Sequence, residues 1–189
     1  DKGSPNLLSM KKGLVKANSE RDKHVQAGSY ADALQQLEFA HGIASRLLPD
    51  AVCLLRELFG EPIAQRARHG EVARLRACFP GGYLAVQCSA DFGDDATLSA
   101  MAAGLDALAR ARALGIVFFR AGAALWHDDM EVLQRAKARM RMPAMLMTSL
   151  DIRDTCALIA ASRGYLGSSL HGRIVAMAHA LPRANLLIP

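Results

Sequence analysis

From Phe79 to the end of the chain, short apolar runs alternate with longer segments whose apolar residues recur at helical spacing. The runs predict strands at 83–88, 116–119, 144–148, 165–167 and 184–188, and the segments between them predict helices at 96–114, 129–142, 152–162 and 170–181. The predicted strands are almost continuously apolar, as strands covered on both faces should be. This alternation predicts an α/β fold with a doubly wound, Rossmann-like parallel sheet and helices on both faces.

The boundaries of these helices carry capping residues. Asp128 and Asp151 each precede a helical pattern and are expected to cap it, with Glu131 as the capping-box partner of Asp128. Gly115 follows the first long helix and is expected to end it in the left-handed conformation. Ile152 is expected to point toward the core.

The chain before Phe79 differs in character from the rest. Residues 1–30 are rich in charge and poor in apolar side chains, and we expect a flexible arm or linker there. Residues 31–78 are expected to form a helical lead-in, in which the proline-interrupted run 47–55 is interpreted as an edge strand and 61–78 as a surface helix. Residues 79–189 would then form the Rossmann-like core. The arginines of the lead-in are expected to be solvated: Arg66, Arg68, Arg74 and Arg76.

The composition narrows the classes of function. The 189 residues are 51% apolar and 22% charged, as in soluble globular domains. No apolar run is long enough to span a membrane and no secretory signal is visible. The net charge of +5 suits an anionic small molecule, whereas 5% aromatic residues argue against nucleic-acid binding. The four cysteines lack metal-site spacing and suit a reducing compartment, so we expect a cytoplasmic protein without metal or cofactor.

Polar residues follow the predicted strands directly. Ligands of open parallel sheets bind beyond the carboxyl ends of the strands, so four loops should converge on one crevice. These loops carry Gln87, Ser89, Asp91, Asp94 and Asp95, then Arg120, Trp126, His127 and Asp128, then Thr148, Ser149 and Asp151, then Ser168, Ser169 and His171. The acids show no calcium-loop spacing, and we interpret them as solvated.

Several of these loop residues are candidates for ligand binding. Arg120 could hold a carboxylate or phosphate in its planar fork, or pair with an aspartate at the crevice rim. Trp126, the only tryptophan, could stack on a sugar or fill a gap over the core. Gln87 and Ser89 are the candidates from the first loop.

The stretch from Gly164 to Pro182 reads as a strand, a polar turn and a helix. Ser168 or Ser169 can cap this helix, which places His171 in its first turn. Free amides and the positive end of the helix dipole favour an anion there and favour a neutral imidazole. His171 could therefore act as general acid or base, or donate to a phosphate, unless it is only a partly exposed histidine of an ordinary capped helix. Arg173 could face the same anion or point sideways into solvent.

The same stretch carries a family resemblance. Ser169-Leu170-His171-Gly172, an apolar helix and then Ala180-Leu181-Pro182-Arg183-Ala184-Asn185 resemble the C-terminal signature of polysaccharide pyruvyl transferases. The likeness runs from about Leu48 to the end of the chain and covers one domain of the two that such enzymes have. Family members often carry arginine where this chain has Ser169, and that arginine helps to hold phosphoenolpyruvate.

The resemblance implies a fold similar to the two-domain glycosyltransferase B type and transfer of a pyruvyl group from phosphoenolpyruvate to a glycan or glycan precursor. The partners would be an anionic donor, a sugar acceptor and an N-terminal domain or partner chain that completes the site. His171 would be catalytic, and the other candidates would bind substrate. The alternatives are a glycosyltransferase of the same type that uses a nucleotide sugar, and a non-catalytic glycan- or partner-binding domain.

Overall fold

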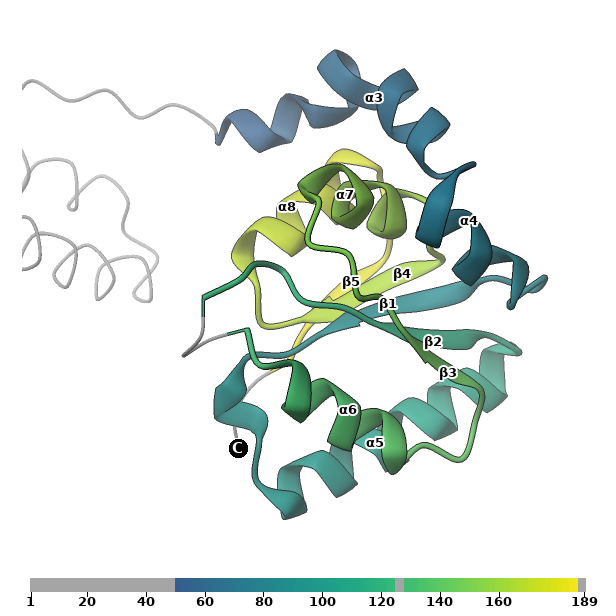
Figure 1. Cartoon of the computed structure of the whole chain (residues 1–189), viewed down its shortest axis with the longest axis vertical. Helices are drawn as coiled ribbons and strands as arrows, with labels where there is room; N and C mark the ends of the chain where they lie inside the picture. Colours follow the sequence, from purple (N-terminus) through teal and green to yellow (C-terminus); the bar gives the residue numbers. More distant parts are fainter. Residues whose placement is uncertain (1–49, 125–127, 187–189) are drawn as a thin grey trace, which may run out of the picture. The chain divides into compact units, whose positions relative to one another are not determined.

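The computed structural model describes residues 50–124 and 128–186 of the chain. Within these residues, five strands form one sheet in which every neighbouring pair is parallel, in the order β3-β2-β1-β4-β5 (Figure 1). The strands are β1 (Tyr83–Gln87), β2 (Gly115–Phe118), β3 (Ala144–Leu146), β4 (Gly164–Gly167) and β5 (Arg183–Asn185). The predicted α/β class and parallel sheet are confirmed.

Helices cover both faces of the sheet, as predicted for a doubly wound fold (Figure 1). One face carries α5 (Asp95–Arg112) and α6 (Met130–Ala138), and the other carries α7 (Ile152–Ala160) and α8 (Leu170–Ala178). The shorter or additional helices are η1 (Ala51–Leu54), α3 (Leu55–Arg66), α4 (Gly70–Ala77) and η2 (Ala90–Phe92). α3 and α4 add to the side of α7 and α8, and α3 lies across α7 (Figure 1).

Two apolar clusters hold these layers together, one on each face of the sheet. Side chains alternate along β1, so Tyr83 and Ala85 belong to the cluster under α7 and α8 while Leu84 and Val86 belong to the cluster over α5 and α6. All five residues of β1 are buried. A central strand covered on both faces is largely apolar, as residues 83–86 are, which is why the sequence pattern identified it.

The strand order creates a switch point between β1 and β4. The connections from these two neighbouring strands lead to opposite faces, through α5 after β1 and through α8 after β4. Ligands of open α/β sheets bind beyond the carboxyl ends of the strands at such a point. Because all strands are parallel, the loops that follow them lie together at the carboxyl ends of the strands, as predicted. This end of the sheet, called the carboxyl edge below, includes the described residues of 87–95, 120–124, 148–151 and 168–171.

Two predicted helix boundaries are wrong by one or two residues. Asp129, not Asp128, caps α6 by accepting a hydrogen bond from the Glu131 amide, and Asp128 instead accepts one from the Ala124 amide. Ala113, not Gly115, takes the left-handed conformation after α5, with a φ of 52°. Gly115 already belongs to β2, where a Cβ would collide with the Phe79 ring.

The predictions for the lead-in also need correction. The run 47–55 is helical where it is described, because residues 51–54 form η1. The helix predicted over 61–78 is two helices, which are separated near Gly70, a residue with a φ of 59°. Ile152 is 63% exposed instead of facing the core, since it begins the first turn of α7 and the buried residues of that helix start at Asp154.

Candidate functional site

The turn after β4 is anchored to the end of β1 by one buried amide. Gln87 is fully buried, and its Oε1 accepts hydrogen bonds from the amides of Ser168 at 3.2 Å and Ser169 at 2.9 Å. The Ser89 amide donates to Ser168 Oγ at 3.1 Å, which joins the two loops a second time. Four predicted site residues, at the end of β1 and in the loops after β1 and β4, therefore meet at the switch point. Their polar atoms are largely used to fix the shape of the turn.

Tyr165 contacts the same turn from its buried side. Its ring is 1% exposed, and its hydroxyl lies 3.4 Å from both Gln87 Oε1 and the Ser169 carbonyl oxygen. Burial raises the pKa of Tyr165 to about 12, so the hydroxyl stays neutral. The ring passes so close to Gly167 and Gly172 that a Cβ on either would collide with it. Gly167 and Gly172 thus make room for a tyrosine that positions the start of α8.

The first turn of α8 presents free backbone donors near the carboxyl ends of β1 and β4. Ser169 is the N-cap, and its Oγ accepts a hydrogen bond from the Gly172 amide at 3.2 Å. Ser168, the other candidate for the cap, is not the N-cap. Within the described residues the amides of Leu170 and His171 have no hydrogen-bond partner. A helix start with free N–H groups favours an anion.

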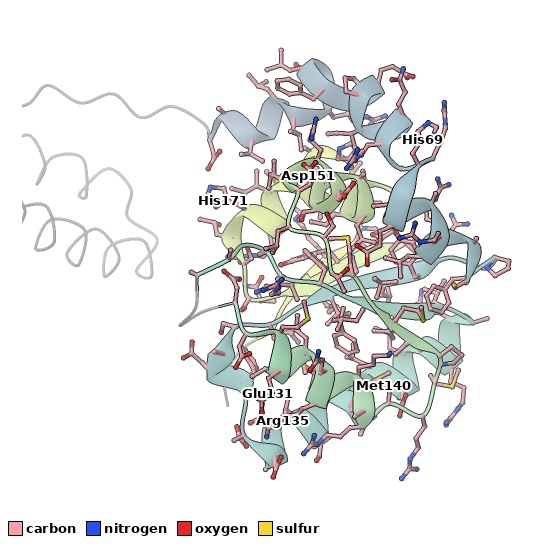
Figure 2. All side chains as sticks on the ribbon, in the orientation of Figure 1. His69, Glu131, Arg135, Met140, Asp151 and His171 are labelled. Atoms are coloured by element: carbon pink, nitrogen blue, oxygen red, sulfur yellow. The ribbon has the colours of Figure 1, made fainter. Side chains whose placement is uncertain are left out.

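His171 lies at this helix start and is 69% exposed (Figure 2). Its Nε2 is 3.5 Å from Oδ2 of Asp50, whose other carboxylate oxygen accepts a hydrogen bond from the Val52 amide. The carboxylate is therefore held in place by η1 while it faces the imidazole. An imidazole near a carboxylate is an arrangement that can take part in proton transfer. The sequence offered no local signal for this pair because its members are far apart in the chain.

Arg120 brings an uncompensated positive charge to the same edge. It follows β2 after Phe119, and it forms no ion pair with any residue of the described ranges. Its Nε is buried without a hydrogen-bond partner there. The alternative of a rim ion pair with an aspartate therefore finds no support in this part of the chain. Trp126 and His127 lie outside the described residues.

Arg173 is held on the β5 side of α8. Its Nη1 donates to Asn185 Oδ1 at 2.7 Å, while its Nε is buried without a partner in the described part of the chain. Asn185 ends β5, so Arg173 also lies at the carboxyl edge of the sheet. Ser89, in contrast, is 3% exposed and donates from Oγ to Asp91 Oδ2 at 3.2 Å.

The acids near the end of β1 have structural partners. Asp94 caps α5 by accepting a hydrogen bond from the Thr97 amide, and Asp95 pairs with Arg135 of α6 and with Arg139, the C-cap of α6. The hydrogen bond from Arg135 lowers the pKa of Asp95. Over residues 50–124 and 128–186, no group of three or more His, Cys, Asp or Glu side chains is arranged to hold a metal ion.

An ion-pair network that the sequence did not suggest fixes the start of α7. Arg66, predicted to be solvated, contacts Asp154 at 2.5 Å and Asp151 at 3.3 Å. Ser149 Oγ donates to Asp154 at 2.6 Å. Glu71 accepts from the amides of Thr148 and Ser149, at 2.8 Å each. The loop after β3 is thus tied to α3 and α4, and its polar residues are engaged in this network.

Opposing effects set the pKa values of these two aspartates. Burial raises the pKa of Asp154, but hydrogen bonds from Arg66 and Ser149 and the charge of Arg66 outweigh burial and lower it. Hydrogen bonds from the Arg153 side chain and amide lower the pKa of Asp151 to about 2. Both carboxylates are therefore harder to protonate in the folded chain than in the unfolded chain.

We expect acid to weaken the fold through this network. The unfolded aspartates bind protons near pH 4, whereas folded Asp151 resists protonation until about pH 2 and the pKa of folded Asp154 is also lowered, so the free energy of unfolding should fall as the pH drops below about 4. Urea unfolding at several pH values between 5 and 2 measures the slope. Arg66→Gln should reduce the slope, and Arg74→Gln, which changes an exposed arginine of the same region, should not. Equal slopes in both variants would contradict the role of Arg66.

No helix in the described ranges is both long and apolar enough to cross a membrane.

The fold and the candidate site can be compared with known proteins. No protein-family model, curated protein or solved structure matches the chain, so its function has to be inferred from the fold and from the residues at the carboxyl edge of the sheet.

Proposed function

We propose that this chain carries the donor-binding half of a transferase that resembles polysaccharide pyruvyl transferases. The observation that carries the proposal is the start of α8, where the free amides of Leu170 and His171 lie at the switch point of a Rossmann-like sheet. Such a position binds phosphate or carboxylate groups, and phosphoenolpyruvate has both.

The positive charge for the donor comes from Arg120 in this proposal. Ser169 replaces the arginine that the family often has, and its Oγ accepts the hydrogen bond of the helix cap. Arg173 is engaged by Asn185. Arg120 has no ion pair in the described part of the chain, so its guanidinium is available for a carboxylate or phosphate.

The reaction requires proton transfers that His171 can perform. Two sugar hydroxyl oxygens bond to C2 of phosphoenolpyruvate, the C2–O bond to phosphate breaks, and C3 gains a proton to become a methyl group. Of the two hydroxyl protons, one is used at C3 and the other leaves with phosphate. An exposed imidazole beside a fixed carboxylate can accept and return such protons.

A second wall would complete the site. The described residues form one sheet with one open carboxyl edge, whereas the transferases that this chain resembles bind their substrates between two domains. We propose that another domain or chain supplies the acceptor-binding wall. Closing such a cleft excludes water and aligns the reactants, so the edge alone should bind the donor and lack most of the rate.

Replacing His171 with alanine should weaken the binding of phosphoenolpyruvate by about 5- to 160-fold, because a hydrogen bond to a charged group contributes ~1–3 kcal/mol. The melting temperature should change little because the side chain is 69% exposed. Isothermal titration calorimetry measures the affinity. His69→Ala is the matched control, since His69 is an exposed histidine at the start of α4, remote from His171 (Figure 2).

The same titrations separate the alternative functions. Tight binding of a nucleotide sugar without phosphoenolpyruvate binding would favour a glycosyltransferase. Binding of free glycans alone would favour a non-catalytic domain. Unchanged phosphoenolpyruvate affinity in His171→Ala would refute the assignment of His171.

A further inference from the structure

A concave site lies within the layer of helices that covers one face of the sheet, away from the carboxyl ends of the strands. It is a cavity of about 400 Å³ between α3, the end of α4 and the C-terminal ends of α7 and α8. Its walls include Ala160 and Ala161 at the end of α7 and His179, the C-cap of α8. Since these helices run antiparallel to the strands, their C-terminal ends lie away from the carboxyl edge. The nine residues of α8 separate the two regions by roughly 14 Å.

The charged side chains of this cavity are all basic. Arg56, Arg68 and Arg76 line it together with His179, and no aspartate or glutamate is among its lining residues. The nearest acids along α3 are Glu57 and Glu61, and the carboxylate of Glu61 accepts a hydrogen bond from Gln65. A concave surface lined by charge of one sign concentrates ions of the opposite sign.

The three arginines differ in the hydrogen bonds that they already form within the protein. Arg76 Nη1 donates to the carbonyl oxygen of Ala67, the C-cap of α3, at 2.9 Å. That bond satisfies a helix end and fixes the guanidinium against the cavity wall. Arg56 and Arg68 form no ion pair or side-chain hydrogen bond within the described ranges. Completing the end of α3 therefore accounts for Arg76 and does not account for Arg56 or Arg68.

The ring of His179 also lines the cavity. Its Nε2 is buried and has no hydrogen-bond partner in the part of the chain that the structure describes. Burial, and then the charge of Arg56, lower the pKa of His179, so the ring is neutral near pH 7. A neutral imidazole can donate a hydrogen bond from its ring N–H to an oxyanion.

We propose that this cavity is a second anion site, which binds the phosphate or diphosphate group of a small molecule between Arg56, Arg68 and Arg76. Planar guanidinium groups bind phosphate oxygens in pairs, and three of them around one cavity suit a group with more than one negative charge. The volume leaves room for a diphosphate. The site does not depend on the donor site at His171, because the two occupy opposite ends of α8.

Titration of the full chain with inorganic pyrophosphate at constant ionic strength tests the proposal. We expect Arg56→Gln with Arg68→Gln to raise the dissociation constant at least about tenfold. The matched control is Arg74→Gln with Arg110→Gln, which removes the same charge from two exposed arginines and should change affinity less than about twofold. His171→Ala should retain pyrophosphate binding, which distinguishes this site from the carboxyl edge.

A second measurement locates the ligand without mutation. Pyrophosphate should shift the NMR signals of the His179 ring and of the Arg56 and Arg68 side chains in the unmodified chain. Equal weakening in the two double variants would mean that net charge alone attracts the anion, and would overturn the proposal. Loss of binding in His171→Ala, or unshifted His179 signals at saturation, would overturn it as well.

Discussion

Replacing Gly167 with alanine should destabilise the protein by about 3 kcal/mol, the upper range for overpacking a core. The new Cβ would lie 2.6 Å from Cζ of Tyr165 and 2.8 Å from the carbonyl oxygen of Gln87, whereas real Cβ atoms essentially never approach within 3.0 Å. The Tyr165 ring is 1% exposed and cannot retreat. The carbonyl belongs to the central strand β1, so relief requires the sheet itself to move.

Urea unfolding measures this effect, and another glycine of the same chain provides the control. Gly104 lies within α5, and a Cβ there would meet nothing within 4 Å. Gly104→Ala should therefore stabilise the protein by up to about 1 kcal/mol through helix propensity. Gly172→Ala should resemble Gly167→Ala in direction, since its Cβ would lie 2.7 Å from Tyr165 Cζ. Wild-type stability in Gly167→Ala would show that Tyr165 does not pack as described.

Replacing Gln87 with methionine should cost about 2–3 kcal/mol. The change keeps the approximate volume of the side chain. It removes the oxygen that accepts hydrogen bonds from the amides of Ser168 and Ser169. Each buried donor left without a partner costs about 1–3 kcal/mol. Removal of Nε2, which has no partner within the described residues, offsets part of the loss.

Chemical unfolding and amide hydrogen exchange together test this expectation. The amides of Ser168 and Ser169 should exchange faster in Gln87→Met, because their acceptor is gone. Gln65→Met is the control, since Gln65 is exposed and donates only to Glu61 in the described part of the chain, and its stability should change by less than about 0.5 kcal/mol. Slow exchange at both amides in Gln87→Met would mean that the turn does not depend on this side chain.

The sequence predicted the sheet well because the pattern of a doubly covered strand is local. β1 and β2 are short, apolar and separated by one long amphipathic helix, and no tertiary information is needed to recognise them. The predicted capping residues were less accurate than the predicted strands, for two physical reasons. Asp128 and Asp129 are adjacent and chemically equivalent as caps, so composition cannot choose between them. Gly115 is needed for the approach of the Phe79 ring, and a glycine there does not mark the end of the helix.

The candidate site was predictable in location and not in its contacts. Parallel strands bring the residues that follow them to one edge, so Gln87, Ser168 and His171 could be placed together before their distances were known. The pairing of His171 with Asp50 and of Arg66 with Asp154 joins segments far apart in the chain. Such contacts depend on how helices pack on the sheet, which hydrophobic periodicity does not specify.

The two outer strands limit how this sheet can assemble with anything else. β3 and β5 each have three residues, and each begins directly after a proline, Pro143 or Pro182. A strand this short offers few free backbone groups to an added strand, and proline contributes no donor at the point of entry. Edge-to-edge extension of the described sheet into a larger one is therefore disfavoured. Any partner domain or second copy should dock through helices and loops, which leaves the carboxyl edge as a surface that can close without disturbing the strands.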